Sequence, residues 1–155
     1  MSFVVKLFSM AGYSGTPLVQ KLGIKPDARI YFANAPADFA VTLGPLPAGV
    51  EQSKPSAKGL DFALLFVTDR TALARQFPKL AGRLKPAGML WVAWPKKASG
   101  MPTDLTENFV RDIGLDVGLV DVKVCAIDDI WSGLKFVYRL KDRKEPRTKK
   151  EPRTK

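Results

Sequence analysis

The sequence contains no histidine and a single cysteine, Cys125. The absence of histidine excludes Ser-His-Asp and Cys-His catalysis, histidine-ligated metals, and the side chain that usually transfers protons near neutral pH. One cysteine forms neither an internal disulfide nor the paired ligands of a zinc finger. Because Cys125 lies between Val124 and Ala126 in an expected strand, we predict a small core thiol. Any chemistry must therefore come from carboxylates, lysines, backbone dipoles or a cofactor.

Long apolar runs are also absent. No run approaches the roughly 18–20 residues that a helix needs to span a bilayer, so we expect no membrane contact. The opening segment MSFVVKLFSM is interrupted by Lys6, and no Ala-x-Ala-like cleavage site follows it, which disfavours a secretory signal. We interpret Met10 as the natural start and residues 1–9 as an N-terminal extension. The single cysteine fits a reducing cytosol, where we expect the protein to be.

The net charge of +10 is unevenly distributed along the chain. Residues 141–155 contain eight lysines or arginines against three acids, and the segment KEPRTK occurs twice, at 144–149 and 150–155. No apolar residue follows Leu140, so we expect a disordered basic tail over residues 141–155. Such a tail could make weak, salt-sensitive contacts with nucleic acid. Residues 10–140 are long enough for a single α/β domain with its own core.

The pattern of apolar residues predicts buried strands alternating with helices. The runs LDFALLFV at 60–67 and GMLWVAW at 88–94 are almost continuously apolar, which is typical of strands buried on both faces of a parallel sheet. We predict another strand at 29–34 and a strand fragment at Val50-Glu51. Helices are expected at 17–22 after Thr16, near 36–43, from Asp69 to about 84, and from about 104 to 115.

Local signals refine these helices. Asp69 can cap the third helix, and Pro78 should kink or split it before the chain turns at Lys85-Pro86-Ala87-Gly88. Asp104 and Glu107 have the spacing of a capping box for the last helix.

The last part of the domain has a different period. Residues 119–127 and 132–139 alternate between apolar and polar positions, with Val120, Val122 and Val124 expected on one face. Period two on both sides of a short Asp128-Asp129 turn predicts an antiparallel hairpin. The chain is therefore predicted to form a three-layer, Rossmann-like α/β sandwich, mostly parallel with this hairpin at one edge.

This order of segments resembles a class I, Rossmann-like methyltransferase, best over residues 60–139. The turn LKPAG followed by the apolar strand MLWVAW is the most specific feature, and GIKPDARIYFANA resembles the first strand of those enzymes. The chain also resembles a bacterial family of short proteins of unknown function, over most of residues 10–139. The matching segments are AGYSGTPLVQKLGIKP, NAP, LWVAWPKKASG, TDLTE and GLVDVKVCAIDDIWSGLKFV.

The methyltransferase resemblance implies an S-adenosylmethionine site after the first strand, but the sequence departs from it there. Those enzymes have an acid and a Gly-x-Gly-x-Gly loop at this point, so that the backbone approaches the cofactor closely. Residues 33–40, ANAPADFA, contain no glycine, and Pro36 removes one N–H donor. We therefore expect no cofactor. The alternative is S-adenosylmethionine with Asn34, Glu51 and Asp69 around it, where Glu51 would bind the ribose hydroxyls.

The chain is also short in this region. Only about 25 residues separate the first strand from the run at 60–67, which is too few for two full β-α units. One strand-helix unit of the usual cofactor-binding half is therefore expected to be missing.

The segment WPKKASG follows a buried parallel strand and should lie at the carboxyl edge of the sheet, where open α/β folds bind ligands. Lys96, Lys97 and Ser99 offer positive charge and a hydroxyl to an anion. The ends of the other strands should line the same crevice, and Trp94 and Trp131 are candidates for a pocket or an interface. The candidate ligand-binding residues are Asn34, Pro36, Glu51, Thr68, Asp69, Trp94, Lys96, Lys97 and Ser99.

Three hypotheses for function follow. The leading one is a non-catalytic module that binds a small anionic or nucleotide-like ligand, or a protein partner, with no catalytic residues and no metal. The second is a divergent S-adenosylmethionine-dependent methyltransferase. The third is an accessory protein that contacts nucleic acid through its basic tail.

Overall fold

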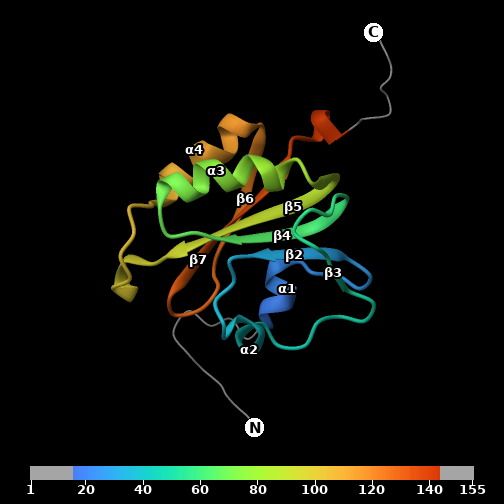
Figure 1. The fold of residues 1–155 in the computed structure, drawn as a ribbon, viewed down its shortest axis with the longest axis horizontal. Helices are drawn as coiled ribbons and strands as arrows, with labels where there is room; N and C mark the ends of the chain where they lie inside the picture. Colours follow the sequence, from blue (N-terminus) through green and yellow to red (C-terminus); the bar gives the residue numbers. More distant parts are fainter. Residues whose placement is uncertain (1–15, 144–155) are drawn as a thin grey trace.

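The computed structural model describes residues 16–143 of the chain. Its centre is a six-stranded sheet with the order β3-β2-β4-β5-β7-β6 (Figure 1). The strands are β2 (Arg29–Ala33), β3 (Glu51–Gln52), β4 (Leu60–Phe66), β5 (Leu84–Pro95), β6 (Leu119–Ala126) and β7 (Trp131–Tyr138). The helices are α1 (Leu18–Leu22), α2 (Phe39–Leu43), α3 (Arg70–Ala81) and α4 (Glu107–Val117), with 3-10 turns η1 (Lys97–Ser99) and η2 (Leu140–Arg143).

The sheet is parallel in one half and antiparallel in the other. Strands β3, β2, β4 and β5 pair in parallel, whereas β7 pairs antiparallel with both β5 and β6. Helices α3 and α4 cover one face, and α1 and α2 cover the other (Figure 1). The structure thus confirms the predicted three-layer, Rossmann-like sandwich with a C-terminal antiparallel hairpin.

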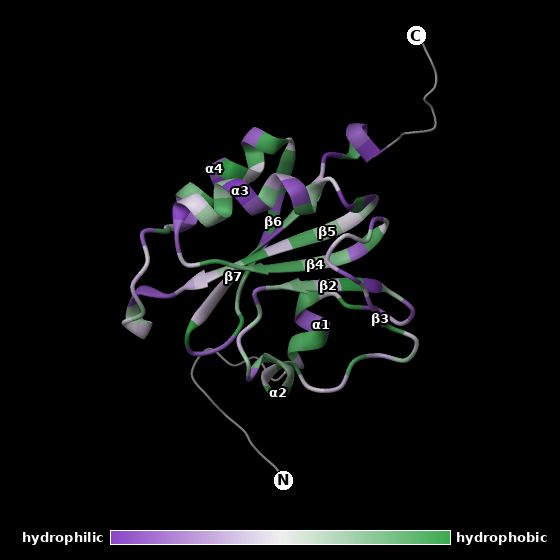
Figure 2. Cartoon of the chain, viewed as in Figure 1, coloured by the Kyte–Doolittle hydropathy of each residue, from purple (hydrophilic) through white to green (hydrophobic). Residues whose placement is uncertain are grey.

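Two apolar clusters hold the layers together. Between the sheet and α3–α4, Phe77 packs edge-on against Phe136 with ring centroids 5.1 Å apart. On the α1–α2 face, the fully buried Trp91 donates from Nε1 to the carbonyl of Leu22 at 2.9 Å, which ties α1 to the central strand. Figure 2 shows that β4 and β5 are apolar along most of their length, as expected for strands covered on both faces.

Helix α3 and the segment after it differ from the prediction. The helix is capped by Asp69, as predicted, through a 2.8 Å bond from the Ala72 N–H, but it runs unbroken through Pro78. Buried side chains before and after the proline, among them Leu73 and Leu80, hold both parts of the helix on the same core. Residues 84–88 are not a simple turn, because they already belong to β5.

The start of β5 is irregular. Leu60 pairs with Leu84, and the register then shifts so that Phe62 pairs with Met89. Gly88 lies inside this irregularity, where a Cβ would come within 2.7 Å of the Leu60 carbonyl oxygen. The LKPAG segment therefore needs glycine for a close approach of two backbones.

Helix α4 begins later than predicted. Thr106 caps it by accepting a 3.2 Å bond from the Phe109 N–H, so the predicted capping box of Asp104 and Glu107 is wrong. Asp104 instead accepts a 2.9 Å bond from the N–H of Arg70, at the start of α3. The carboxylate thus caps a helix that is distant in sequence, which short-range spacing does not reveal.

The hairpin is confirmed, but its first strand is not regular. A register shift between Asp121 and Lys123 interrupts the alternation expected for the valines of β6. Val122 and Val124 are each 52% exposed. The predicted N-terminal extension and most of the predicted tail lie outside the described residues. No helix within residues 16–143 is long and apolar enough to cross a bilayer.

Replacing Gly88 with alanine should lower the free energy of unfolding by about 1–3 kcal/mol, because the added methyl group meets backbone rather than a mobile side chain. Gly82→Ala is the matched control, since Gly82 has a φ of −68° and its Cβ would make only 3.6 Å contacts. We expect that control to be neutral or stabilising by about 0.4–1 kcal/mol. Urea unfolding of both variants measures the difference, and equal stabilities would contradict the close approach.

Candidate functional site

The carboxyl ends of β2, β4 and β5 lie side by side at one edge of the sheet. Ala33 pairs with Leu65, and Phe66 pairs with Ala93, so the chain leaves these three strands at neighbouring points. Of the candidate residues, this edge brings together Asn34, Thr68, Asp69, Lys96 and Lys97, which continue the chain directly beyond the strand ends. It is the place where open α/β sheets bind ligands.

The side chain of Asn34 holds the end of β2 to β4 and α3 at this edge. Its backbone has a φ of +61°, in the left-handed region that asparagine tolerates better than most residues. The side-chain Nδ2 donates to the Phe66 carbonyl at 3.0 Å and to Gln76 Oε1 at 2.8 Å. Both amide hydrogens therefore join the end of β2 to β4 and α3, and neither is left for a ligand.

Pro36 lies beside an apolar cavity of about 320 Å³ at the same edge, between α2 and the short strand β3. Among the residues that line this cavity, Gln52 has a polar side chain. The cavity is lined by Phe32, Ala35, Pro36, Ala37, Phe39, Ala40, Leu43, Gly44, Leu46 and Gln52. Apart from Gln52, the side chains that line it are apolar, and none of them is charged.

Glu51 lies away from this edge. It pairs with Arg29 in the β2–β3 register, and its Oε1 is 3.6 Å from Arg29 Nε at the amino end of β2. Strand β3 ends opposite Ile30, so the chain departs before it reaches the level of Asn34. The structure does not bring Glu51 to the place where it would bind ribose hydroxyls, because the strand that carries it is only two residues long.

Several of the other candidates already have structural partners. Asp69 caps α3, and the Thr68 carbonyl accepts a 2.6 Å bond from Thr103 Oγ1. The Ser99 hydroxyl donates to the Lys96 carbonyl at 2.6 Å and accepts from the Met101 N–H at 3.2 Å, which closes the turn at η1.

The two tryptophans proposed for a pocket are in the core. Trp94 is 6% exposed and packs in the cluster under α3 and α4. Trp131 is 8% exposed and lies edge-on to Phe66 at 5.1 Å. Neither ring presents a face to a ligand, because each is buried in an apolar cluster on its own face of the sheet.

Lys96 and Lys97 are the last two candidate residues at this edge. The Lys96 backbone N–H donates to the Ile130 carbonyl at 2.7 Å, which fixes the chain just beyond β5. Neither lysine side chain forms an ion pair or a hydrogen bond with any residue from 16 to 143. The positive charge at this edge is therefore available.

No family model matches the sequence, and no curated protein matches it. Solved structures do. A SAM-dependent methyltransferase from Aquifex aeolicus is 14% identical with a TM-score of 0.54, over 77% of this chain and 86% of that one. Precorrin-6y C5,15-methyltransferase from Geobacter metallireducens is 10% identical with a TM-score of 0.53, over 79% and 86%. Magnesium protoporphyrin IX methyltransferase from Synechocystis, solved with bound SAM, is 12% identical with a TM-score of 0.50, over 79% and 74%.

The fold is methyltransferase-like. At these identities the likeness concerns the fold alone. Three features of this chain do not fit S-adenosylmethionine in the usual position. Residues 33–43 contain no glycine, the Asn34 amide is already bonded, and no acid stands at the end of β3.

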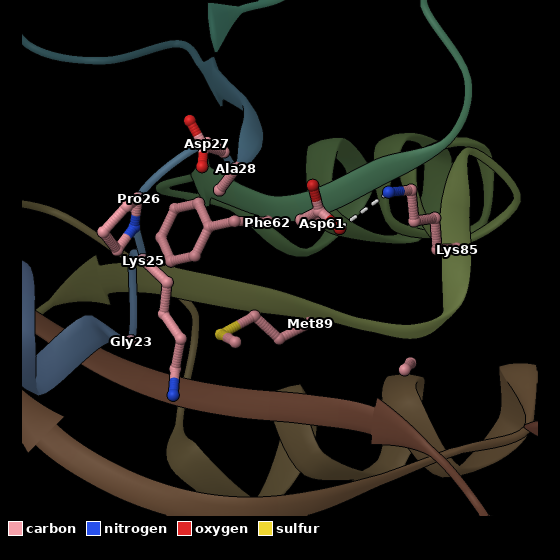
Figure 3. Close-up of a pocket in the computed structure, with 10 residues that line it drawn as sticks. Gly23, Lys25, Pro26, Asp27, Ala28, Asp61, Phe62, Lys85 and Met89 are labelled. Carbon is pink, nitrogen blue, oxygen red and sulfur yellow. Dashed lines mark ion pairs between the residues drawn. The ribbon is translucent and has the colours of Figure 1, made fainter. Parts of the chain in front are cut away.

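A second, charged pocket lies at the opposite, amino end of the parallel strands, and the sequence patterns do not reveal it (Figure 3). Its volume is about 440 Å³. On one side, Lys85 Nζ is 3.1 Å from Asp61 Oδ1, and the other oxygen of Asp61 accepts a 2.8 Å bond from the Arg29 N–H. Lys25 lies on the other side, and its side chain points away from Asp27 (Figure 3).

Asn34 makes a testable contribution to the carboxyl edge. We expect Asn34→Ala to lower the free energy of unfolding by about 1–3 kcal/mol, because it leaves the partners of the amide unsatisfied and keeps a Cβ at positive φ. Asn34→Gly loses the same bonds but relieves the backbone, so it should be less destabilising. Chemical denaturation checks the order wild type, glycine, alanine. An alanine variant as stable as the wild type would contradict a stabilising role of the Asn34 side-chain hydrogen bonds.

Proposed function

We propose that this protein is a non-catalytic, methyltransferase-like module that binds a small anionic or nucleotide-like ligand at the carboxyl edge of its sheet. The observation that supports this best is the pair Lys96 and Lys97, placed directly after β5 with no acidic partner within residues 16–143. The edge is the usual ligand-binding side of open α/β sheets.

The chemistry of this edge favours an anion. Each lysine ammonium carries three donors and no acceptor, which suits phosphate or carboxylate oxygens. Thr68 is exposed at the neighbouring strand end and adds a hydroxyl. The apolar cavity beside Pro36 lies at the same edge and has a volume within the range of small-molecule sites. An adenosine-like group with a negatively charged substituent matches both features.

The same edge gives little support for catalysis. The sequence has no histidine, and within the described residues no group of three or more carboxylates and thiols is placed to hold a metal. At the position of the cofactor loop of the methyltransferase-like fold, this chain has Asn34, whose side chain is bonded to the Phe66 carbonyl and to Gln76. These observations therefore support ligand binding at this edge better than catalysis.

A divergent S-adenosylmethionine-dependent methyltransferase is the second candidate. The structural neighbours favour it, because they include methyltransferases and one of them was solved with bound SAM. This candidate requires a way of holding the cofactor that uses neither a glycine-rich loop nor an acid after β3. The apolar cavity beside Pro36 is the place for it.

Thermal unfolding with millimolar ATP, S-adenosylmethionine or S-adenosylhomocysteine separates the two candidates. We expect ATP to raise the unfolding temperature and the two sulfur compounds to have no effect. A ligand at 100 times its Kd adds about 2.7 kcal/mol, which is a shift of several degrees at this size. The double variant Lys96→Gln, Lys97→Gln should lose the ATP shift while its stability without ligand changes by no more than about 0.5 kcal/mol.

The matched control removes the same charge elsewhere. Lys54 and Lys58 are exposed in the loop between β3 and β4, so Lys54→Gln with Lys58→Gln should keep the ATP shift. An S-adenosylmethionine shift that survives the Lys96 and Lys97 changes would reject the leading proposal and favour the methyltransferase.

The third hypothesis concerns the basic tail over residues 141–155. Residues 141–143 belong to η2, the rest of the tail lies outside the described residues, and the hypothesis remains a prediction. If the tail contacts nucleic acid, a chain that ends at Arg143 should lose salt-sensitive binding to an oligonucleotide in a fluorescence anisotropy titration. The described domain is left intact by that truncation. Equal binding by the full and truncated chains would exclude a tail-mediated interaction.

A further inference from the structure

Lysines from three parts of the chain meet at the carboxyl end of α1. Lys123 and Lys135 are opposite each other in the β6–β7 register. Lys123 Nζ donates to the Lys21 carbonyl at 3.0 Å, so it reaches from the hairpin to α1. Lys135 stands beside Trp91 in the β5–β7 register, on the face that Trp91 shares with α1. Like charges directly opposite each other on a sheet are unfavourable without a counter-charge.

Lys135 is the least satisfied member of this group. It is half-buried and forms no ion pair or hydrogen bond within the described part of the chain. Burial lowers the pKa of its ammonium, and repulsion from Lys123 and Lys25 lowers that pKa further. Lys25, from the loop after α1, lines a pocket together with Gly23, and a Cβ built on Gly23 would lie 4.0 Å from Lys135 Nζ. Within residues 16–143 none of the three ammonium groups forms an ion pair. Of the two acids that line the adjoining pocket, Asp61 is paired with Lys85, and the Lys25 side chain points away from Asp27 (Figure 3).

The lysine group adjoins the pocket of Figure 3. Gly23 lines that pocket, and a Cβ built on it would lie 3.3 Å from Met89 Sδ and 4.0 Å from Lys135 Nζ. The Lys135 ammonium therefore lies close to Gly23, which lines the pocket, and Lys25 lines the pocket itself. The lysine group therefore lies beside a pocket of about 440 Å³.

We propose that Lys25, Lys123 and Lys135 bind the phosphate group of a small phosphorylated molecule, whose remaining atoms occupy the pocket beside Met89 and Pro26. A phosphate dianion would neutralise the repulsion and accept charge-assisted bonds from all three ammonium groups. The volume matches small-molecule sites. The site lies at the amino end of the strands and uses none of the residues of the proposed carboxyl-edge site.

A small ligand fits better than a nucleic acid. Lys135 is half-buried rather than set on a protruding surface, and no aromatic ring lies open beside the three lysines for a base to stack on. Phe62 and Trp91, the rings closest in the fold, are fully buried.

The test is calorimetric titration with inorganic phosphate and with adenosine monophosphate, together with thermal unfolding. We expect both probes to bind the wild type, and Lys123→Gln with Lys135→Gln to weaken binding about tenfold or more. Tighter binding of the nucleotide would identify an organic phosphate, and equal binding would identify inorganic phosphate. Lys54→Gln with Lys58→Gln should leave binding unchanged. In a protein that already carries Lys96→Gln and Lys97→Gln, adding Lys123→Gln with Lys135→Gln should still weaken phosphate binding about tenfold or more, which separates this site from the carboxyl edge.

The variant Lys135→Met distinguishes phosphate binding from a purely structural role of these lysines. Because it removes a desolvated and repelled charge, it should raise the unfolding temperature without phosphate and abolish the phosphate-induced rise. The proposal is overturned if phosphate and the nucleotide fail to bind at millimolar concentration, if the Lys123 and Lys135 variant binds as the wild type does, or if Lys135→Met lowers the unfolding temperature. Binding of an oligonucleotide alone would overturn it as well.

Discussion

The structure depends on the pairing of β5 with strands of opposite direction on its two sides. β5 continues the parallel half through β4 and begins the antiparallel half through β7. Trp91, at its centre, is fully buried and bonded to the Leu22 carbonyl, so the first helix is held to the same strand. Both edges that carry ligand candidates are positioned by this strand, because Lys96 follows its carboxyl end and Lys85 lies near its start.

The methyltransferase-like fold is combined with a segment after β2, residues 33–43, that contains no glycine. The connection between β2 and β4 is short, and β3 consists of two residues. Glu51 lies beside Arg29, and Asn34 bonds directly to the end of β4 and to α3. Within residues 16–143, the side chains of Lys96 and Lys97 on one edge and of Lys135 on the other form no ion pair or hydrogen bond.

Much of the fold could be predicted from local patterns. Continuous apolar runs identified β4 and β5, alternation identified the hairpin, and Asp69 was recognised as a cap because its partner is three residues away. The failures involved distant partners. Asp104 caps α3 rather than its own helix, and LKPAG enters the sheet because β4 lies beside it. Trp94 and Trp131 were expected near a pocket, but Trp94 is buried in the cluster under α3 and α4, and Trp131 packs against Phe66.

The sequence by itself determined the layers, the parallel and antiparallel halves, and the loss of a glycine-rich loop, because these follow from the period of apolar residues and from residue types at adjacent positions. Only the tertiary structure decided which polar groups are free. Asn34 is occupied by Phe66 and Gln76, more than thirty residues away. Lys25, Lys123 and Lys135 meet only because β6, β7 and α1 converge. Charges from distant segments form a site through packing, and packing is not encoded in the spacing of those residues.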